Sequence, residues 1–259
     1  MGKVHNFDES NKTSKIGNLL LEGLQNSFLI KGNVESTKGG GYEDKTKKID
    51  GYIYSTDENG KGFKHSMQIK IDLKHPISGS IALELAEMNY DHRNLLSNAR
   101  NGNLLQEQLF DVDFIIYICP GHGIYFWKPK KLNFLTHKLL TNYTRLNSWL
   151  EVKNTFRLVI ADNKDWLSIN YLVPYHMINE PNNYRFKLID WENDTWEGAP
   201  VAVGPEKVIP WYDVLGTVQK NYPDKYQEIV TLIVEYANGF GITNRDKILR
   251  SWELNPEQT

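Results

Sequence analysis

The sequence has very little cysteine: Cys119 is the single thiol among 259 residues. No intrachain disulfide can form, so the fold must be stabilised by an ordinary hydrophobic core. Hydrophobic residues make up 40% of the chain, which is sufficient for such a core. A lone cysteine, which we expect to be a buried and inert thiol, is typical of a reducing compartment, and a cytoplasmic location is therefore expected.

Long apolar runs and an excess of one charge are also missing. No segment approaches the roughly 18 apolar residues that span a bilayer, and the polar start MGKVHNFDESNKTSK lacks the apolar stretch of a secretory signal. Membrane insertion is therefore not expected. The 30 Lys and Arg residues nearly balance the 32 Asp and Glu residues, for a net charge of −2. A nucleic-acid partner would have to bind a local basic groove.

Hydrophobic periodicity predicts a mixed central β-sheet flanked by helices, an α/β fold. Helices are expected over residues 14–28, 131–150 and 225–238, and strands over 28–35, 49–55, 63–74, 80–88, 112–119, 123–128, 155–161, 167–173 and 184–190. Residues 80–88 also suit a short helix, but their alternating pattern favours a strand. We expect a flexible N-terminus over residues 1–13, a main domain over 14–195 and a helical C-terminal appendage over 196–259, which could belong to the same domain.

The clearest local signal is a β-hairpin centred on Asn59-Gly60, a dipeptide typical of tight hairpin turns. Because side chains alternate across a strand, the second strand of the hairpin has one uniformly apolar face and one polar face. The polar face carries Gln68, Lys70, Asp72 and Lys74. With the turn at this position, Asp50 falls opposite Ile69 or Lys70, give or take a residue, and therefore beside Gln68 and Lys70.

This group of side chains has the composition of a divalent-cation site. Asp50 offers a carboxylate, Gln68 a side-chain carbonyl and Ile69 a backbone carbonyl, and Mg²⁺ prefers oxygen ligands. The ammonium of Lys70 could orient or deprotonate a water molecule and offset phosphate charge. A metal ion that lowers the pKa of its water is the usual means of hydrolysing a phosphodiester.

At these residues the sequence resembles the PD-(D/E)XK nuclease superfamily, and most closely its restriction-type branch, in which Gln replaces the second acid (D…QXK). The matching residues are Asp50 on one strand and Gln68 with Lys70 on the next, while Glu22 lies on the first helix, where the family often has a glutamate. The resemblance covers roughly residues 14–128. It implies a restriction-endonuclease-like fold, Mg²⁺ or Mn²⁺ as cofactor, and cleavage of nucleic acid, with DNA as the expected form, in restriction, phage defence or recombination.

Several alternatives stay open at this point. No proline precedes Asp50, and Asp72-Leu73-Lys74 fits the commoner DXK form, so Asp72 and Lys74 could be the active pair instead. Glu22 taken alone is more typical of an ordinary helix-surface acid. Because Gln68 is uncharged, a catalytically inactive nucleic-acid-binding or protein-interaction module on the same fold is a second hypothesis. DNA versus RNA, and a homodimer versus another protein partner, are also undecided.

An aromatic cluster near the C-terminus is the remaining feature of note. It consists of Trp191, Trp196, Trp211 and Tyr212. Such clusters can stack on bases, but more often they cover a small satellite core, and that interpretation is favoured here.

Overall fold

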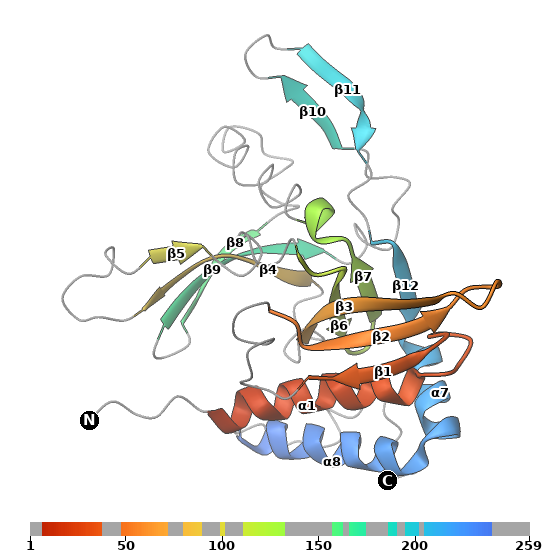
Figure 1. Cartoon of the computed structure of the whole chain (residues 1–259). Helices are drawn as coiled ribbons and strands as arrows, with labels where there is room; N and C mark the ends of the chain where they lie inside the picture. Colours follow the sequence, from red (N-terminus) through yellow and green to blue (C-terminus); the bar gives the residue numbers. More distant parts are fainter. Residues whose placement is uncertain are drawn as a thin grey trace. The chain divides into compact units, whose positions relative to one another are not determined.

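The computed structural model describes residues 7–37, 48–71, 80–89, 99–101, 111–132, 157–162, 166–174, 186–190, 195–201 and 205–239. The chain divides into two compact units. The first comprises Met1–Ser78, Gln108–Phe126 and Lys207–Thr259, and the second comprises Gly79–Glu107 and Trp127–Glu206. The predicted hairpin lies in the first unit (Figure 1).

A six-stranded mixed sheet forms the frame of the first unit. Its strands, in spatial order, are β1 (Asn33–Ser36), β2 (Gly51–Thr56), β3 (Gly62–Ile71), β6 (Phe114–Cys119), β7 (Gly123–Trp127) and β12 (Lys207–Pro210). The first three strands form an antiparallel meander, β3 and β6 are parallel, and β7 and β12 are antiparallel. The chain therefore has the mixed α/β fold that the periodicity predicts.

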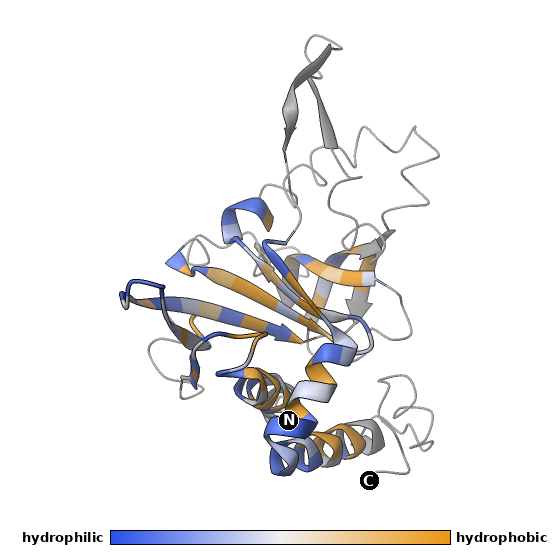
Figure 2. Cartoon of the chain, turned by 90° about the vertical axis from the view of Figure 1, so that its right-hand side faces the viewer, coloured by the Kyte–Doolittle hydropathy of each residue, from blue (hydrophilic) through white to orange (hydrophobic). Residues whose placement is uncertain are grey.

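Three helices share one hydrophobic core with this sheet: α1 (Phe7–Leu24), α7 (Trp211–Asn221) and α8 (Pro223–Gly239). Helices α1 and α8 lie side by side along the sheet (Figure 1). On α1, Ile16, Leu20 and Leu24 recur every fourth residue and are fully buried, as expected of one face of an amphipathic helix. A Cβ on Gly17 would lie 3.1 Å from Cγ2 of Ile69, so the helix contacts β3 closely at this glycine. In Figure 2 some strands of the sheet are largely hydrophobic, whereas the hairpin strands and the helices carry both hydrophilic and hydrophobic residues.

The described strands of the second unit form two antiparallel sheets. One has the order β5 (Ala99–Asn101), β4 (Ser80–Asn89), β9 (Trp166–Pro174) and β8 (Arg157–Asp162), and the other pairs β10 (Phe186–Asp190) with β11 (Thr195–Val201). The choice of strand over helix for residues 80–88 is confirmed. Ile81, Leu83 and Leu85 are all buried, in the alternating pattern that favoured a strand.

Element boundaries differ from the predictions mainly around the first helix. Helix α1 begins at Phe7, before the predicted start at residue 14, because a helix whose later turns are packed extends with little further loss of free energy. It ends at Leu24 rather than near Phe28. There Ser27 Oγ donates a hydrogen bond to the Leu24 carbonyl (2.6 Å) and accepts one from the Leu29 amide (3.1 Å). This turn delays β1 to Asn33.

The C-terminal part contains a helix that the sequence did not predict. Helix α7 begins at Trp211, which is buried in the main core rather than in a satellite core, so the prediction for this member of the aromatic cluster was wrong. Trp191 lies outside the described residues. Of the helix predicted over 131–150, only residues up to 132 are described, and residues 129–132 are helical. Within the part of the chain that the structure describes, no helix is both long and apolar enough to cross a membrane.

Candidate functional site

The predicted hairpin forms with its turn at Asn59-Gly60. Strands β2 and β3 pair from Thr56 opposite Gly62 to Gly51 opposite Met67. One further step along this ladder sets Asp50 opposite Gln68, one residue from the predicted partner Ile69. The Asp50 amide donates to the Met67 carbonyl (2.9 Å), and the Asp50 carboxylate accepts a hydrogen bond from the Ile69 amide (2.6 Å). The structure therefore brings Asp50 beside residues 67–69 of β3.

Neighbouring backbone contacts fix the position of Asp50. The Thr37 amide donates to the Asp50 carbonyl (2.8 Å), and the Thr37 hydroxyl donates to the Ile49 carbonyl (2.9 Å). The following residue must be glycine for this close approach: a Cβ on Gly51 would lie 2.6 Å from Cε of Met67 and 2.7 Å from the carbonyl oxygen of Glu35. Asp50 is thus held between the ends of β1 and β3.

Strand β3 has the two faces that the sequence predicts. Met67, Ile69 and Ile71 pack in or against the helix-covered core, so the alternation of side chains turns Gln68 and Lys70 to the opposite face. Gln68 is only 5% exposed. Among the described residues, two buried side-chain oxygens have no hydrogen-bond partner: Oε1 of Gln68 and Oδ1 of Asn18 on α1. Buried polar atoms are nearly always paired, so an unpaired oxygen in the middle of a sheet calls for a physical explanation.

A second carboxylate, which the sequence did not single out, binds β3 from its other edge. Oδ2 of Asp113, just before β6, accepts hydrogen bonds from the Ser66 amide (2.8 Å) and the Ser66 hydroxyl (3.0 Å). The Asp113 amide in turn donates to the Ser66 carbonyl (3.1 Å). Two aspartates therefore clamp β3, with Asp50 on the β2 side and Asp113 on the β6 side. No local pattern predicts this contact, because it depends on β3 and β6 being neighbours.

Glu22 lies on the helix side of the sheet. Its carboxylate forms an ion pair with Lys225 of α8 (2.7 Å) and accepts a longer hydrogen bond from the Ser36 hydroxyl (3.4 Å). Ser36 pairs with Gly51, so Glu22 lies near the end of β2 that carries Asp50. The ion pair links two packed helices, α1 and α8.

The alternative pair Asp72 and Lys74 lies outside the described residues. Within the described ranges, no group of three or more His, Cys, Asp or Glu side chains is placed to hold a metal ion. The oxygen donors near Asp50 are of a different kind: the side-chain amide of Gln68 and the backbone carbonyl of Ile69. Cys119 is buried, as predicted, and His122 lies in the turn between β6 and β7.

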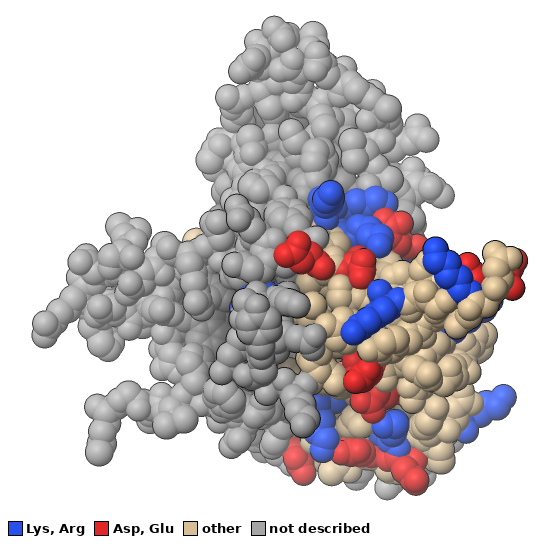
Figure 3. Space-filling model, viewed as in Figure 1, with Lys and Arg blue, Asp and Glu red and all other residues tan. Residues whose placement is uncertain are grey.

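Aromatic and basic side chains continue along the hairpin from this position. The Lys64 ammonium lies 3.7 Å from the ring centroid of Tyr52 and 5.5 Å from that of Tyr54. By alternation along β3, Lys64 shares the face of Gln68 and Lys70. Basic and acidic side chains are interspersed over the described surface in the view of Figure 3.

Comparisons with protein-family models, with curated proteins and with solved structures found no match to this chain.

Proposed function

We propose that this chain is a metal-dependent nuclease that hydrolyses phosphodiester bonds of nucleic acid, with Asp50, Gln68 and Lys70 at the active site. The observation that carries the proposal is the unpaired, buried Oε1 of Gln68, beside the segment of β3 to which the Asp50 carboxylate is bound. A cation would provide the partner that this oxygen lacks. DNA is the substrate expected from the family resemblance.

The donor set beside β3 suits Mg²⁺ or Mn²⁺. Backbone amides and carbonyls of one residue point to the same edge of a strand, so the Ile69 carbonyl faces the same side as the amide that Asp50 accepts. Asp50, Gln68 and the Ile69 carbonyl would therefore hold the ion, as a carboxylate, an amide and a backbone oxygen. When bound, the ion would lower the pKa of a water molecule and offset negative charge on the phosphate.

The protein's own side chains have separate tasks in this proposal. Asp50 supplies the charged ligand, and its hydrogen bond to the Ile69 amide holds the carboxylate in place beside β3. Lys70 shares a face with Gln68, where its ammonium can orient a water molecule and contact phosphate oxygens. Lys64, with Tyr52 and Tyr54, extends this face along the hairpin and offers further contacts to a nucleic-acid backbone and to bases.

The order of elements supports the restriction-endonuclease-like assignment. Helix α1 with Glu22 is followed by β1, then by β2, which Asp50 directly precedes, and then by β3 with Gln68 and Lys70. This is the order of the family that the sequence resembles. The next strand of this sheet along the chain, β6, pairs parallel with β3, so β3 has a neighbouring strand on each edge. The restriction or phage-defence setting follows from the same resemblance.

Cleavage of supercoiled plasmid in the presence of Mg²⁺ tests the proposal. Asp50→Asn and Lys70→Ala should each lower the rate by ~100-fold or more, since each removes a group that acts on the reacting phosphate or its metal. One matched control should keep the wild-type rate: Asp113→Asn, which changes the other carboxylate bound to β3. Circular dichroism verifies that every variant is folded.

The same assay decides between catalysis and binding alone. Cleavage that stops on chelation with EDTA and depends on Asp50 supports the nuclease. Salt-sensitive binding of DNA without cleavage would instead support the inactive binding module, which the neutral Gln68 keeps open as the second candidate. Cleavage that survives EDTA, or an Asp50→Asn variant that cuts at the wild-type rate, would overturn the proposed site.

A further inference from the structure

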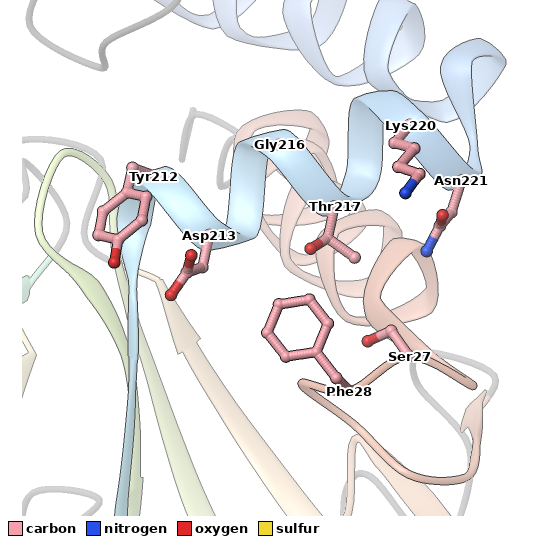
Figure 4. Close-up of a pocket in the computed structure, with 8 residues that line it drawn as sticks. All are labelled: Ser27, Phe28, Tyr212, Asp213, Gly216, Thr217, Lys220 and Asn221. Carbon is pink, nitrogen blue, oxygen red and sulfur yellow. The ribbon is translucent and has the colours of Figure 1, made fainter.

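A groove on the first unit lies between helix α7 and the turn that follows α1. It has a volume of about 450 Å³ and is flanked by two strongly exposed aromatic side chains, Phe28 (73% exposed) and Tyr212 (70% exposed). Figure 4 shows Phe28 facing α7 across the groove, with Tyr212 and Asp213 near one end of the helix and Lys220 and Asn221 near the other. Exposed aromatic rings around a groove are typical of a surface that binds another protein.

Both walls of the groove are held in place. On the helix side, Val214 and Val218 are fully buried, which anchors α7 to the core and leaves the groove side outward. On the turn side, Ser27 bonds back to the end of α1, and the Lys207 ammonium donates a hydrogen bond to the Leu29 carbonyl. Hydrogen bonds therefore hold the turn on both sides of Phe28. Fixing the Phe28 backbone in an interface requires little further loss of entropy.

The helix wall of the groove allows a close approach. Gly216 is exposed, and a Cβ placed there would have no atom within 4 Å. The helix backbone is therefore open at the centre of α7. Small residues at such a position let another helix pack at a short interaxial distance.

The side chains of α7 that line the groove form a self-complementary series. Asp213 and Lys220 are equidistant from the Gly216–Thr217 peptide bond, and so are Tyr212 and Asn221. If a second α7 crosses antiparallel with that bond at the centre, each Asp213 meets the Lys220 of the other copy. The Gly216 of one copy then meets Thr217 of the other. This is the pattern of a two-fold interface, in which the same patch contacts itself.

We propose that this groove is a homodimer interface, in which α7 packs antiparallel against α7 of a second copy and Phe28 and Tyr212 are buried at the contact. The opposite charges at the two ends of one helix specify the antiparallel orientation, because a parallel crossing would bring like charges together. The proposal is independent of the nuclease assignment, since none of its residues belongs to the candidate active site.

The size of the patch sets the expected strength of the dimer. Stable interfaces bury about 800 Å² per partner, and one helix of 11 residues with a neighbouring turn lies at the small end of that range. The dimer should therefore be in rapid exchange with monomer and favoured at high concentration. The aromatic residues Phe28 and Tyr212 should contribute most of the affinity, with the charge pairs adding orientation.

Sedimentation equilibrium of the full chain, over a wide concentration range, tests the proposal. Wild-type protein should show monomer–dimer association. Asp213→Lys alone and Lys220→Asp alone should each weaken it by about tenfold or more, because each replaces two attractive contacts with two repulsive ones. An equimolar mixture of these two variants should regain association near the wild-type level, since every contact then pairs opposite charges again. Phe28→Ser should also weaken association, and mixing it with either charge-reversed variant should not restore the wild-type level.

The control and the contradicting outcomes are equally specific. Lys61→Asp reverses an exposed charge on the hairpin and should leave association unchanged, and thermal melting shows whether each variant keeps its fold. A wild-type chain that stays monomeric at its highest soluble concentration would overturn the proposal. Association that both charge reversals leave intact, or that the mixture fails to restore, would also overturn it. The groove would then be better explained as a binding site for a different protein.

Discussion

Gln68 combines two properties that conflict in a purely structural residue: it is buried, and its side-chain oxygen has no hydrogen-bond partner. Burying an unpaired polar atom costs about 1–3 kcal/mol of stability. Functional sites commonly retain such unfavourable arrangements because the missing partner is the ligand. Within the proposed site, that partner is the metal ion.

A substitution at Gln68 separates stability from activity. Gln68→Leu should raise the free energy of unfolding by about 1–2 kcal/mol, since it removes the unpaired oxygen and keeps a side chain of similar size. The same variant should lose metal-dependent cleavage. Asn18→Ala is the matched control because Asn18 holds the other unpaired buried oxygen, on α1. It should also be stabilised but keep full activity. Urea unfolding and plasmid cleavage measure the two quantities; a Gln68→Leu variant with wild-type cleavage would remove the residue from the site.

Gly51 illustrates a steric requirement next to Asp50. An added Cβ would contact Cε of Met67 and the backbone carbonyl of Glu35 at 2.6 and 2.7 Å, so Gly51→Ala must shift β1 away from β2. We expect a loss of about 1–3 kcal/mol in the free energy of unfolding, as for other overpacked sites. Gly62→Ala, on the same hairpin, has nothing within 4 Å of the added atom and should be nearly neutral. Equal stability of the two variants in chemical denaturation would contradict the close packing at Gly51.

At the scale of the element, the hairpin was predictable and its surroundings were not. The Asn59-Gly60 turn and the alternation of polar and apolar residues predicted the partner of Asp50 on β3 to within one residue. The contact of Asp113 with Ser66 joins residues 47 apart, and the ion pair of Lys225 with Glu22 joins residues 203 apart. Both depend on which elements become neighbours, and local patterns do not determine that.

Strand β3 should depend on both clamping aspartates for stability. Asp113→Ala removes the acceptor of two hydrogen bonds from Ser66 and should lower the free energy of unfolding by about 1–3 kcal/mol. Cleavage, measured under conditions where the variant is folded, should be retained, because Asp113 lies on the opposite edge of β3 from Asp50. Loss of activity in a fully folded Asp113→Ala variant would indicate that the site extends to this edge.

Helix α8 carries a tyrosine that makes stability dependent on alkaline pH. Burial raises the pKa of Tyr226 above its usual value of 10.0. The folded state therefore keeps the phenol neutral, while the unfolded chain ionises first as the pH rises through about 10. Stability from this group is fully present below that pH and is lost above it. Tyr226→Phe should reduce the loss of stability between about pH 9 and pH 11. A Tyr226→Phe variant whose stability falls with pH as steeply as that of the wild type would contradict this assignment.

Helix α7 shows why an element can be missed although its pattern is present. Trp211, Val214, Leu215 and Val218 are buried at helical spacing. Glycine and β-branched residues lower the intrinsic helix propensity of the same segment, and tertiary packing overrides that preference. The buried face of α7 can therefore be recognised in the sequence only after the core against which it packs is known.

For the whole molecule, composition and periodicity predicted a mixed α/β fold, and the structure confirms it. The chain was expected to have a main domain followed by an appendage. In the structure, the C-terminal helices α7 and α8 share the core of the first unit with α1. Residues distant in sequence assemble each unit, so the linear order of elements is a weak guide to grouping. The mixed sheet positions the candidate site because its central strand, β3, contacts neighbours on both edges.

Binding of Mn²⁺ to the full chain, measured by calorimetry with plasmid cleavage alongside, tests the proposed site most directly. Wild-type protein should bind Mn²⁺. Asp50→Asn should lose most of the affinity because it removes the charged ligand, and Gln68→Leu should show a smaller loss, since a neutral carbonyl contributes less than a carboxylate. Lys70→Ala should bind Mn²⁺ as the wild type does and yet fail to cleave. A wild-type chain that binds no Mn²⁺, or an Asp50→Asn variant that binds it with unchanged affinity, would contradict a metal-dependent nuclease built on β3.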